Sequence, residues 1–226
     1  SMKNLIFDEN VEIIFDEVED VIIEGKSSLK KIKGLKLRNN GNYLCKALVI
    51  TTGTFLEGII HQGEKSWSAG RMNSKPSIKL ANFFKNHGFE MLRLKTGTPP
   101  RLDSKSIDFK KCIRQQGDRE PEAFSFLTKD LPIKQIDCFI THTNKETHNI
   151  IRENLSKSPI FDGRIKSRGP RYCPSLEDKV HKFNTKDKHQ IFLEPETYQN
   201  EIIYPNGIST SLPTRIQKKF LKTIKG

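Results

Sequence analysis

Long apolar runs are missing from this sequence. No stretch of the 226 residues approaches the length of a membrane-spanning helix, and we expect no secretory signal ahead of the first strand. Hydrophobic residues make up 35% of the chain and the mean hydropathy is −0.59, which is typical of a soluble, polar protein. We therefore predict no membrane contact and a core of one large or two small domains.

Cysteine and metal-ligand motifs are also scarce. The four cysteines are widely spaced: Cys45, Cys112, Cys138 and Cys173. They form no C-x-x-C pair, which argues against a zinc ribbon or a thioredoxin-like motif and fits a reducing compartment. The six histidines form no H-E-x-x-H motif, and His142 and His148 lie six residues apart, so they do not share a helical face. We predict no metal site.

A dinucleotide-binding fingerprint is missing as well. No G-x-G-x-x-G follows a first strand, and no acidic residue stands roughly 20 positions after one. The segment Lys95–Arg101 resembles a phosphate-binding loop only superficially, because it lacks the G-x-x-x-x-G-K-[ST] spacing. Its double proline with Gly-Thr favours a hinge at which an inserted domain leaves a sheet.

Positive charge, in contrast, is abundant. The chain has 39 Lys and Arg against 27 Asp and Glu, a net charge of +12, and its pI is about 9.5. Such an excess favours a polyanionic partner, for example a nucleic acid. A Lys-rich genome explains the same charge, because Lys and Asn recur in obvious loops.

The first 50 residues are predicted to form strands and turns. Apolar-rich runs occur at Val11–Phe15 and Val18–Ile23, and turn residues cluster at Glu24–Ser28 and Asn39–Asn42. The run Cys45–Gly53 then predicts a buried parallel strand that ends at a glycine. An apolar strand that ends in glycine is common, so the pattern alone does not identify a cofactor site.

Further along, predicted helices and strands alternate. We expect a polar loop over His61–Asn73 and a helix from about Ser77 to His87. From about residue 101 the composition predicts an insert that mixes strands with a helix opening at Asn144. A strand over His189–Glu194 is expected to return to the main sheet, and a last helix begins near Pro213 at its N1 position.

The stretch Gly169–Phe183 contains the densest chemical pattern. Leu176, Val180 and Phe183 recur at i, i+4 and i+7, which predicts an amphipathic helix. Ser175 with an aspartate three residues later forms a capping-box pattern, so this helix is expected to start at about Leu176.

Cys173 stands just before this predicted helix. The unpaired N–H groups and macrodipole of a helix start, with Arg171 two residues away, would lower the pKa of the thiol toward the reactive thiolate. The same N–H groups are equally suited to a phosphate. A buried, inert cysteine ahead of an ordinary capped helix is the third interpretation.

The run Gly169–Phe183 resembles the signature of the GidA (MnmG) flavoproteins. Further blocks resemble that family, in family order: Thr51–Leu56, Arg93–Arg101, Ile140–Asn144, His189–Glu196 and Tyr204–Pro213. The resemblance covers nearly the whole chain, and several long blocks in order are more specific than one short motif. Asn200–Tyr204 departs from the family pattern, because two residues rather than one separate its Asn-Glu pair from the tyrosine.

This resemblance implies an α/β fold, namely a partial FAD/NAD(P)-binding Rossmann-like domain of the glutathione-reductase type with a β-meander and an inserted α+β domain. We expect residues 1–100 to form the partial FAD-binding domain, 101–188 the inserted NADH- and substrate-binding domain, and 189–226 the return to the FAD-binding domain. The family has its fingerprint upstream and a partner-binding region downstream, so we expect an internal fragment that is inactive in isolation.

The resemblance also implies a function for the intact protein. FAD, NADH and methylene-tetrahydrofolate would be used to install 5-carboxymethylaminomethyl on the wobble uridine of tRNA, with a GTPase partner of the MnmE/TrmE family. A homodimer is expected at full length, in the cytoplasm of bacteria or in a eukaryotic mitochondrion or plastid. Two alternatives are a basic tRNA-docking module without chemistry and a folate- and FAD-dependent tRNA uridine methyltransferase relative, which matches the long blocks less well.

Site residues follow from the same resemblance. Val18, Gly53 and Ser77 align with FAD-contacting positions, although a serine at a helix start is also simply a cap. Cys173 is the catalytic candidate, as the nucleophile that adds to C6 of uridine so that C5 can attack a methylene group, or as a general acid. The family's NAD-binding segment is the same run: Gly169, Pro170, Arg171, Tyr172, Cys173, Pro174, Ser175, Leu176, Glu177, Asp178, Lys179, Val180, His181, Lys182 and Phe183.

Overall fold

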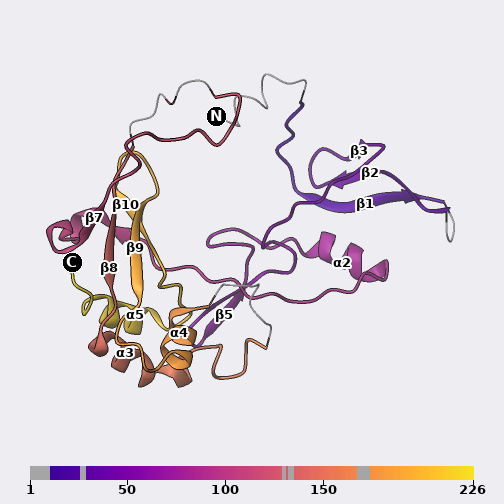
Figure 1. Cartoon of the computed structure of the whole chain (residues 1–226). Coiled ribbons are helices and arrows are strands. Elements are labelled where there is room, and N and C mark those ends of the chain that lie inside the picture. Colours follow the sequence, from indigo (N-terminus) through magenta and orange to yellow (C-terminus); the bar gives the residue numbers. More distant parts are fainter. Residues whose placement is uncertain (1–10, 26–28, 129–130, 132–134, 167–173) are drawn as a thin grey trace. The chain divides into compact units, whose positions relative to one another are not determined.

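The computed structural model describes residues 11–25, 29–128, 131, 135–166 and 174–226 (Figure 1). The chain divides into two compact units. The first comprises Ser1–Ile60 and Trp67–Leu92, and the second comprises His61–Ser66 and Arg93–Gly226. Within the described residues, no helix is long and apolar enough to cross a membrane.

The first unit contains a three-stranded antiparallel sheet in the order β1-β2-β3. Its strands are β1 (Val18–Glu24), β2 (Lys31–Leu37) and β3 (Asn42–Leu44). The predicted strand at Val18–Ile23 is therefore confirmed. The predicted strand at Val11–Phe15 is wrong, since these residues pair with no neighbour among the described residues and the Phe15 side chain is 92% exposed.

The parallel strand predicted at Cys45–Gly53 is also wrong. Residues 45–52 run beside the sheet without a ladder partner in the described part of the chain. Leu48 packs against the core, whereas Val49 is 85% exposed. An apolar run becomes a strand only when a second segment pairs with its backbone, and the apolar pattern does not reveal that segment.

Helix α2 (Ile78–Asn86) completes the core of this unit. Leu80 and Phe83 on its buried face meet Val21 of β1. Ser77 is the N-cap and Gly88 follows the helix with a φ of +79°, so the predicted boundaries are confirmed.

A hairpin then replaces the loop that was predicted over His61–Asn73. Its strands are β4 (Ile59–Gln62) and β5 (Lys65–Ser68). Gly63 at its turn has a φ of +56°, a conformation that glycine adopts without strain.

The second unit is built on a five-stranded antiparallel sheet in the order β6-β10-β9-β8-β7. The strands are β6 (Leu102–Asp103), β7 (Ile113–Gln115), β8 (Cys138–His142), β9 (Gln190–Pro195) and β10 (Ile202–Asn206). The helices are α3 (Lys145–Arg152), α4 (Leu176–Lys182) and α5 (Thr214–Leu221), with short 3₁₀ turns at Ser104–Ser106, Phe109–Lys111 and Leu155–Lys157. Together the two units confirm the predicted α/β class with a meander and an α+β body.

One face of this sheet is buried beneath the helices. Ile191 and Leu193 of β9 and Ile203 of β10 pack into one cluster with Val180 of α4 and Phe220 of α5. Since successive side chains of a strand alternate between the two faces, the residues between these belong to the opposite face.

Two local predictions in this unit are confirmed and two differ. A helix opens at Asn144, which forms a capping box with Thr147, and a strand covers the residues after His189. The strand that was expected to return to the main sheet, β9, lies between β10 and β8, and β8 belongs to the predicted insert. The last helix begins at Thr214 with Pro213 as N-cap, one residue later than predicted. The three-domain division at 100 and 188 remains a prediction.

Candidate functional site

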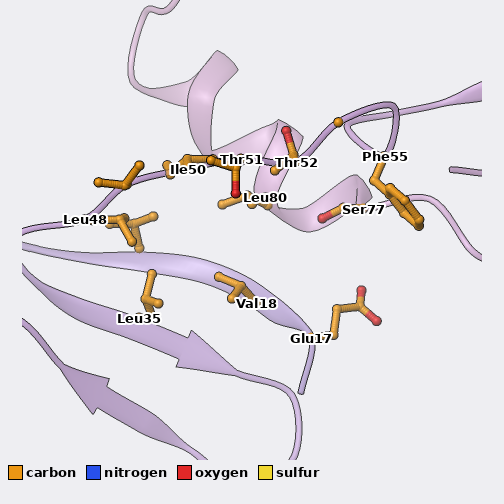
Figure 2. A pocket seen from close by; sticks show the side chains of 13 residues that line it. Glu17, Val18, Leu35, Leu48, Ile50, Thr51, Thr52, Phe55, Ser77 and Leu80 are labelled. Atoms are coloured by element: carbon orange, nitrogen blue, oxygen red, sulfur yellow. The ribbon is translucent and has the colours of Figure 1, made fainter. Parts of the chain in front are cut away.

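A pocket of about 520 Å³ opens in the first unit, between the sheet and α2 (Figure 2). This volume lies in the range of small-molecule sites. The lining residues come from β1, β2, the segment after β3 and the start of α2: Glu17, Val18, Val21, Leu35, Leu48, Val49, Ile50, Thr51, Thr52, Gly53, Phe55, Ser77 and Leu80.

The pocket has an apolar floor and a polar rim. Figure 2 shows Val18 and Leu35 on the sheet and Leu80 on α2. Thr51 and Thr52 belong to the segment after β3, which passes opposite the sheet. A floor of this kind accommodates a flat, largely apolar ring system, and the hydroxyl groups at the rim provide polar partners that orient it.

Backbone groups add to the rim. In the described part of the chain β1 is an edge strand, so one of its edges has no strand partner. Gly53 has a φ of +56°, and a Cβ at this position would meet nothing within 4 Å. Gly53 therefore adopts a left-handed backbone conformation at the pocket wall, and the space beside its Cα is open.

Ser77 is held by its backbone rather than by its side chain. Its N–H donates to Phe55 O at 2.8 Å, and its C=O accepts from Glu57 N at 3.2 Å. The side chain makes no capping hydrogen bond to α2. The hydroxyl thus lines the pocket without the local partner that a simple cap would have.

The structure brings Val18, Gly53 and Ser77 together in this one pocket, although they lie in three separate segments. Sequence reasoning missed Leu35 and Leu48 in the same floor. Their only signal was an apolar position in a strand-like run, which equally predicts ordinary core.

The second predicted site is described only from Pro174 onward. Gly169, Pro170, Arg171, Tyr172 and Cys173 lie outside the described residues. Helix α4 follows as predicted, with Ser175 as N-cap and a reciprocal capping box with Asp178. Leu176 and Val180 are buried, but Phe183 is 48% exposed, because the helix ends at Lys182 and Phe183 leaves the helical spiral.

Two backbone N–H groups at the start of α4 already donate hydrogen bonds within the protein. Leu176 N donates to Ser209 O at 2.7 Å, and Asp178 N donates to Ser175 Oγ at 3.2 Å. Burial raises the pKa of Asp178, but hydrogen bonds from Lys95, at 2.9 Å, and Ser175 outweigh this and leave the pKa below 3.8. An anion bound at this helix start would therefore have to displace existing contacts and face a carboxylate.

Glu177 ties α4 to the loop before α5. Its side chain is fully buried, and Oε1 accepts from Ser211 N at 2.9 Å, Ser211 Oγ at 3.3 Å and Ser158 Oγ at 3.4 Å. Its other oxygen, Oε2, has no partner among the described residues. Two blocks far apart in sequence are thus joined by one carboxylate, a contact that no local pattern signals.

Two buried histidines lie beside this helix. The rings of His148 and His189 are 5.1 Å apart, and Thr143 Oγ1 contacts His148 Nε2 at 2.8 Å. Burial, followed by the charges of His148, Lys179 and Lys186, lowers the pKa of His189 to about 4. His189 is therefore neutral near pH 7. Within the described residues, no three His, Cys, Asp or Glu side chains come together as a metal site.

Comparisons with known proteins show the family of this chain. The family model for Glucose inhibited division protein A matches residues 1–226. The chain is 49% identical, over 99% of its length and 35% of the relative, to the tRNA uridine 5-carboxymethylaminomethyl modification enzyme MnmG of Geobacillus kaustophilus. It is 50% identical, over 96% of its length and 34% of the relative, to the enzyme of that name from Thermodesulfovibrio yellowstonii.

A solved structure agrees. The form I crystal structure of Aquifex aeolicus GidA is similar with a TM-score of 0.87 at 42% identity, covering 100% of this chain and 38% of the other. The chain thus spans about a third of the length of the curated relatives it matches.

Proposed function

Because the chain belongs to the Glucose inhibited division protein A family, we propose that it forms part of a flavoprotein that installs 5-carboxymethylaminomethyl on the wobble uridine of tRNA. The observation that carries this proposal is the 49% identity, over nearly the whole chain, to a relative named for that modification. This identity favours the modification enzyme over the alternative of a folate-dependent methyltransferase.

The pocket of the first unit fits part of FAD. Its apolar floor at Val18, Leu35 and Leu80 suits a flat ring, and the Ser77 hydroxyl, which makes no capping hydrogen bond, suits a polar edge. The glycine turn at Gly53 leaves open space where a Cβ would otherwise project. When bound, FAD would supply two-electron redox chemistry, while these residues bind and orient it and exclude water from one face.

NADH is proposed as the reductant, with contacts in Gly169–Phe183. Since the described start of α4 is occupied by its own capping bonds, the contacts would fall on residues before Pro174 or on exposed side chains of the helix. Methylene-tetrahydrofolate is proposed as the one-carbon donor. Cys173 would add to C6 of uridine, which makes C5 nucleophilic toward the methylene group, or would act as general acid.

tRNA, a GTPase of the MnmE/TrmE family and a second copy of the full-length chain are the proposed partners. The net charge of +12 supports a polyanionic substrate. We place the intact protein in the bacterial cytoplasm or in a eukaryotic organelle.

The test uses the full-length protein with its GTPase partner and GTP, FAD, NADH, methylene-tetrahydrofolate, glycine as the source of the carboxymethylamino part of the product, and an unmodified tRNA that has uridine at the wobble position. Mass spectrometry of the digested tRNA should show the 5-carboxymethylaminomethyl nucleoside, and omission of NADH or folate should abolish it. Formation of 5-methyluridine alone would favour the methyltransferase class, and no product under any combination would overturn the proposal.

A further inference from the structure

Helix α5 presents a surface whose charged side chains are all positive. Four exposed cationic residues recur at i, i+3, i+4 and i+7, the spacing of one side of a helix: Arg215, Lys218, Lys219 and Lys222. Ile216 and Phe220 lie on the opposite side, in the core beneath the sheet. We call the four cationic residues the α5 basic face.

The segment that contains this face has no carboxylate of its own. Residues 202–226 include no Asp or Glu, although the whole chain has 27 of them. Within the described residues, none of the four cationic side chains forms an ion pair. A lysine-rich composition adds lysines throughout a chain but does not remove acidic residues from one segment. The positive charge of this face is therefore local and uncompensated.

The helix beside this face does not neutralise it. Helix α3 packs against α5. On α3 and its C-cap, two cations, Lys145 and Arg152, stand against two carboxylates, Glu146 and Glu153. In the described part of the chain, neither carboxylate forms an ion pair with a residue of α5. Since the charges on α3 cancel, α5 keeps its positive excess.

The C-terminal end of α5 is bordered by further positive charge. Asp108 N donates to Gly226 O at 2.8 Å, which brings the 3₁₀ turn Phe109–Lys111 to this end. The Asp108 carboxylate is paired with Lys111 at 3.1 Å. Lys110 and Lys225 are exposed and extend the basic face.

The face is held on a fixed support. Thr223 Oγ1 lies 2.7 Å from Thr147 Oγ1 of α3, and Thr141 Oγ1 of β8 donates to Lys225 O at 2.7 Å. Phe220 is fully buried. The backbone of this end of the chain is therefore anchored to α3 and to the sheet, while the cationic side chains remain in solvent.

We propose that the α5 basic face binds the phosphate backbone of RNA. The inference rests on the proposed function, because the RNA would be the tRNA substrate. Side chains three or four positions apart on one side of a helix have Cβ atoms about 5–6 Å apart, so several cations can contact separate phosphates of one strand. Such contacts position a nucleic acid without reading its sequence. The affinity they supply comes from neutralised phosphates and released counterions.

The composition of the face favours RNA over a protein or a membrane. The centres of protein–protein interfaces are enriched in aromatic side chains and depleted of lysine. The exposed positions of α5 hold no apolar or aromatic side chain. A helix that lies on a membrane inserts its apolar side among the lipids, but the apolar side of α5, with Ile216 and Phe220, is already buried in the protein.

The experiment measures the affinity of the full-length protein for an unmodified tRNA transcript over a series of salt concentrations. The α5 triple variant combines three substitutions: Lys218→Gln, Lys219→Gln and Lys222→Gln. The matched control removes the same charge from three exposed lysines on or directly before β2: Lys30→Gln, Lys31→Gln and Lys36→Gln. Glutamine has nearly the helix propensity of lysine, so α5 should remain helical.

The α5 triple variant should bind tRNA roughly 50- to 200-fold more weakly at about 0.15 M salt, because each phosphate contact contributes about four- to sixfold there. The slope of log affinity against log salt should become shallower by about 2 to 3. The β2 triple variant should keep the wild-type slope, since screening limits the effect of distant charges. Lys219→Gln alone should make the slope shallower by about one, which keeps the test decisive if the triple variant does not fold.

Equal losses of affinity in the α5 and β2 triple variants would overturn the inference, because net charge alone would then explain binding. Unchanged tRNA affinity in the α5 triple variant would also overturn it. If that variant instead lost binding to phosphatidylglycerol vesicles, the face would be a membrane contact. Loss of tRNA affinity in the α5 triple variant, with wild-type protein that modifies no tRNA, would overturn the proposed function and leave this inference standing.

Discussion

The buried carboxylate of Glu177 supports a quantitative prediction. In Glu177→Ala, Ser211 N–H loses a charged acceptor at 2.9 Å, and two serine hydroxyls lose a partner. A hydrogen bond to a charged group contributes about 1.5–3 kcal/mol, and a buried donor left unpaired costs about 1–3 kcal/mol. Removing a carboxylate whose Oε2 has no partner in the described residues offsets part of this loss. We expect a net cost of about 2–3 kcal/mol.

Hydrogen exchange of the full-length protein provides the assay. At about 1.4 kcal/mol per factor of ten, the amide of Ser211 should exchange roughly 30- to 150-fold faster in Glu177→Ala. Glu177→Gln keeps an acceptor at the Oε1 position, so its exchange should change by less than about fivefold. Lys182→Ala, at the exposed end of the same helix, is the matched control and should leave exchange at Ser211 unchanged.

Two results would refute this reasoning. Wild-type exchange at Ser211 in Glu177→Ala would mean that the carboxylate does not fasten the loop. Equal acceleration in Glu177→Gln and Glu177→Ala would mean that the negative charge, and not the acceptor geometry, holds it.

Three further predictions concern α4 and its surroundings. Ser175→Ala removes the capping box and should destabilise the fold by about 1 kcal/mol, measured as a lower urea midpoint, whereas Lys182→Ala should not. Burial depresses the pKa of His189 from 6.5 to about 4, so the unfolded chain binds the proton more tightly than the folded chain. The free energy of unfolding should therefore decrease as the pH is lowered from 6.5 to 4, by up to about 3 kcal/mol. In His189→Gln the urea midpoint should depend less on pH across this range, and an unchanged dependence would contradict the assignment. Cys173→Ser should abolish tRNA modification while bound flavin is retained, and wild-type modification by this variant would exclude a catalytic thiol.

The features that sequence predicted well are local ones. The capping pair at Ser175, the helix start at Asn144 and the boundaries of α2 depend on residues within about one turn of each other, and all three are confirmed. Such signals lie within a few positions of the chain, so the sequence contains them completely.

The features that failed depend on distant partners. The apolar run Cys45–Gly53 has the composition of a strand but forms no ladder in the described part of the chain, and β9 pairs with β8 of the predicted insert. The Glu177–Ser211 contact joins residues 34 positions apart. The alignment of Ile113, Ile140 and Phe192 across β7, β8 and β9 likewise requires the register of two ladders, which local patterns do not specify.

The candidate site shows the same division. The resemblance pointed to Val18, Gly53 and Ser77 one at a time, and only the fold shows that they line a single cavity. Leu35 and Leu48 in its floor appeared in the sequence as ordinary apolar positions, since alternation predicts burial but does not say what the residue faces.

Flavin retention tests the central claim most directly. Val18→Trp fills the pocket, and Leu44→Trp adds the same ring at a side chain that is 68% exposed and does not line the pocket. Overpacking of this kind costs roughly 1–3 kcal/mol, so the full-length Val18→Trp protein should bind FAD about 5- to 150-fold more weakly than wild type, whereas Leu44→Trp should match wild type. Equal flavin content and affinity in Val18→Trp and wild type would contradict the assignment of this pocket to FAD.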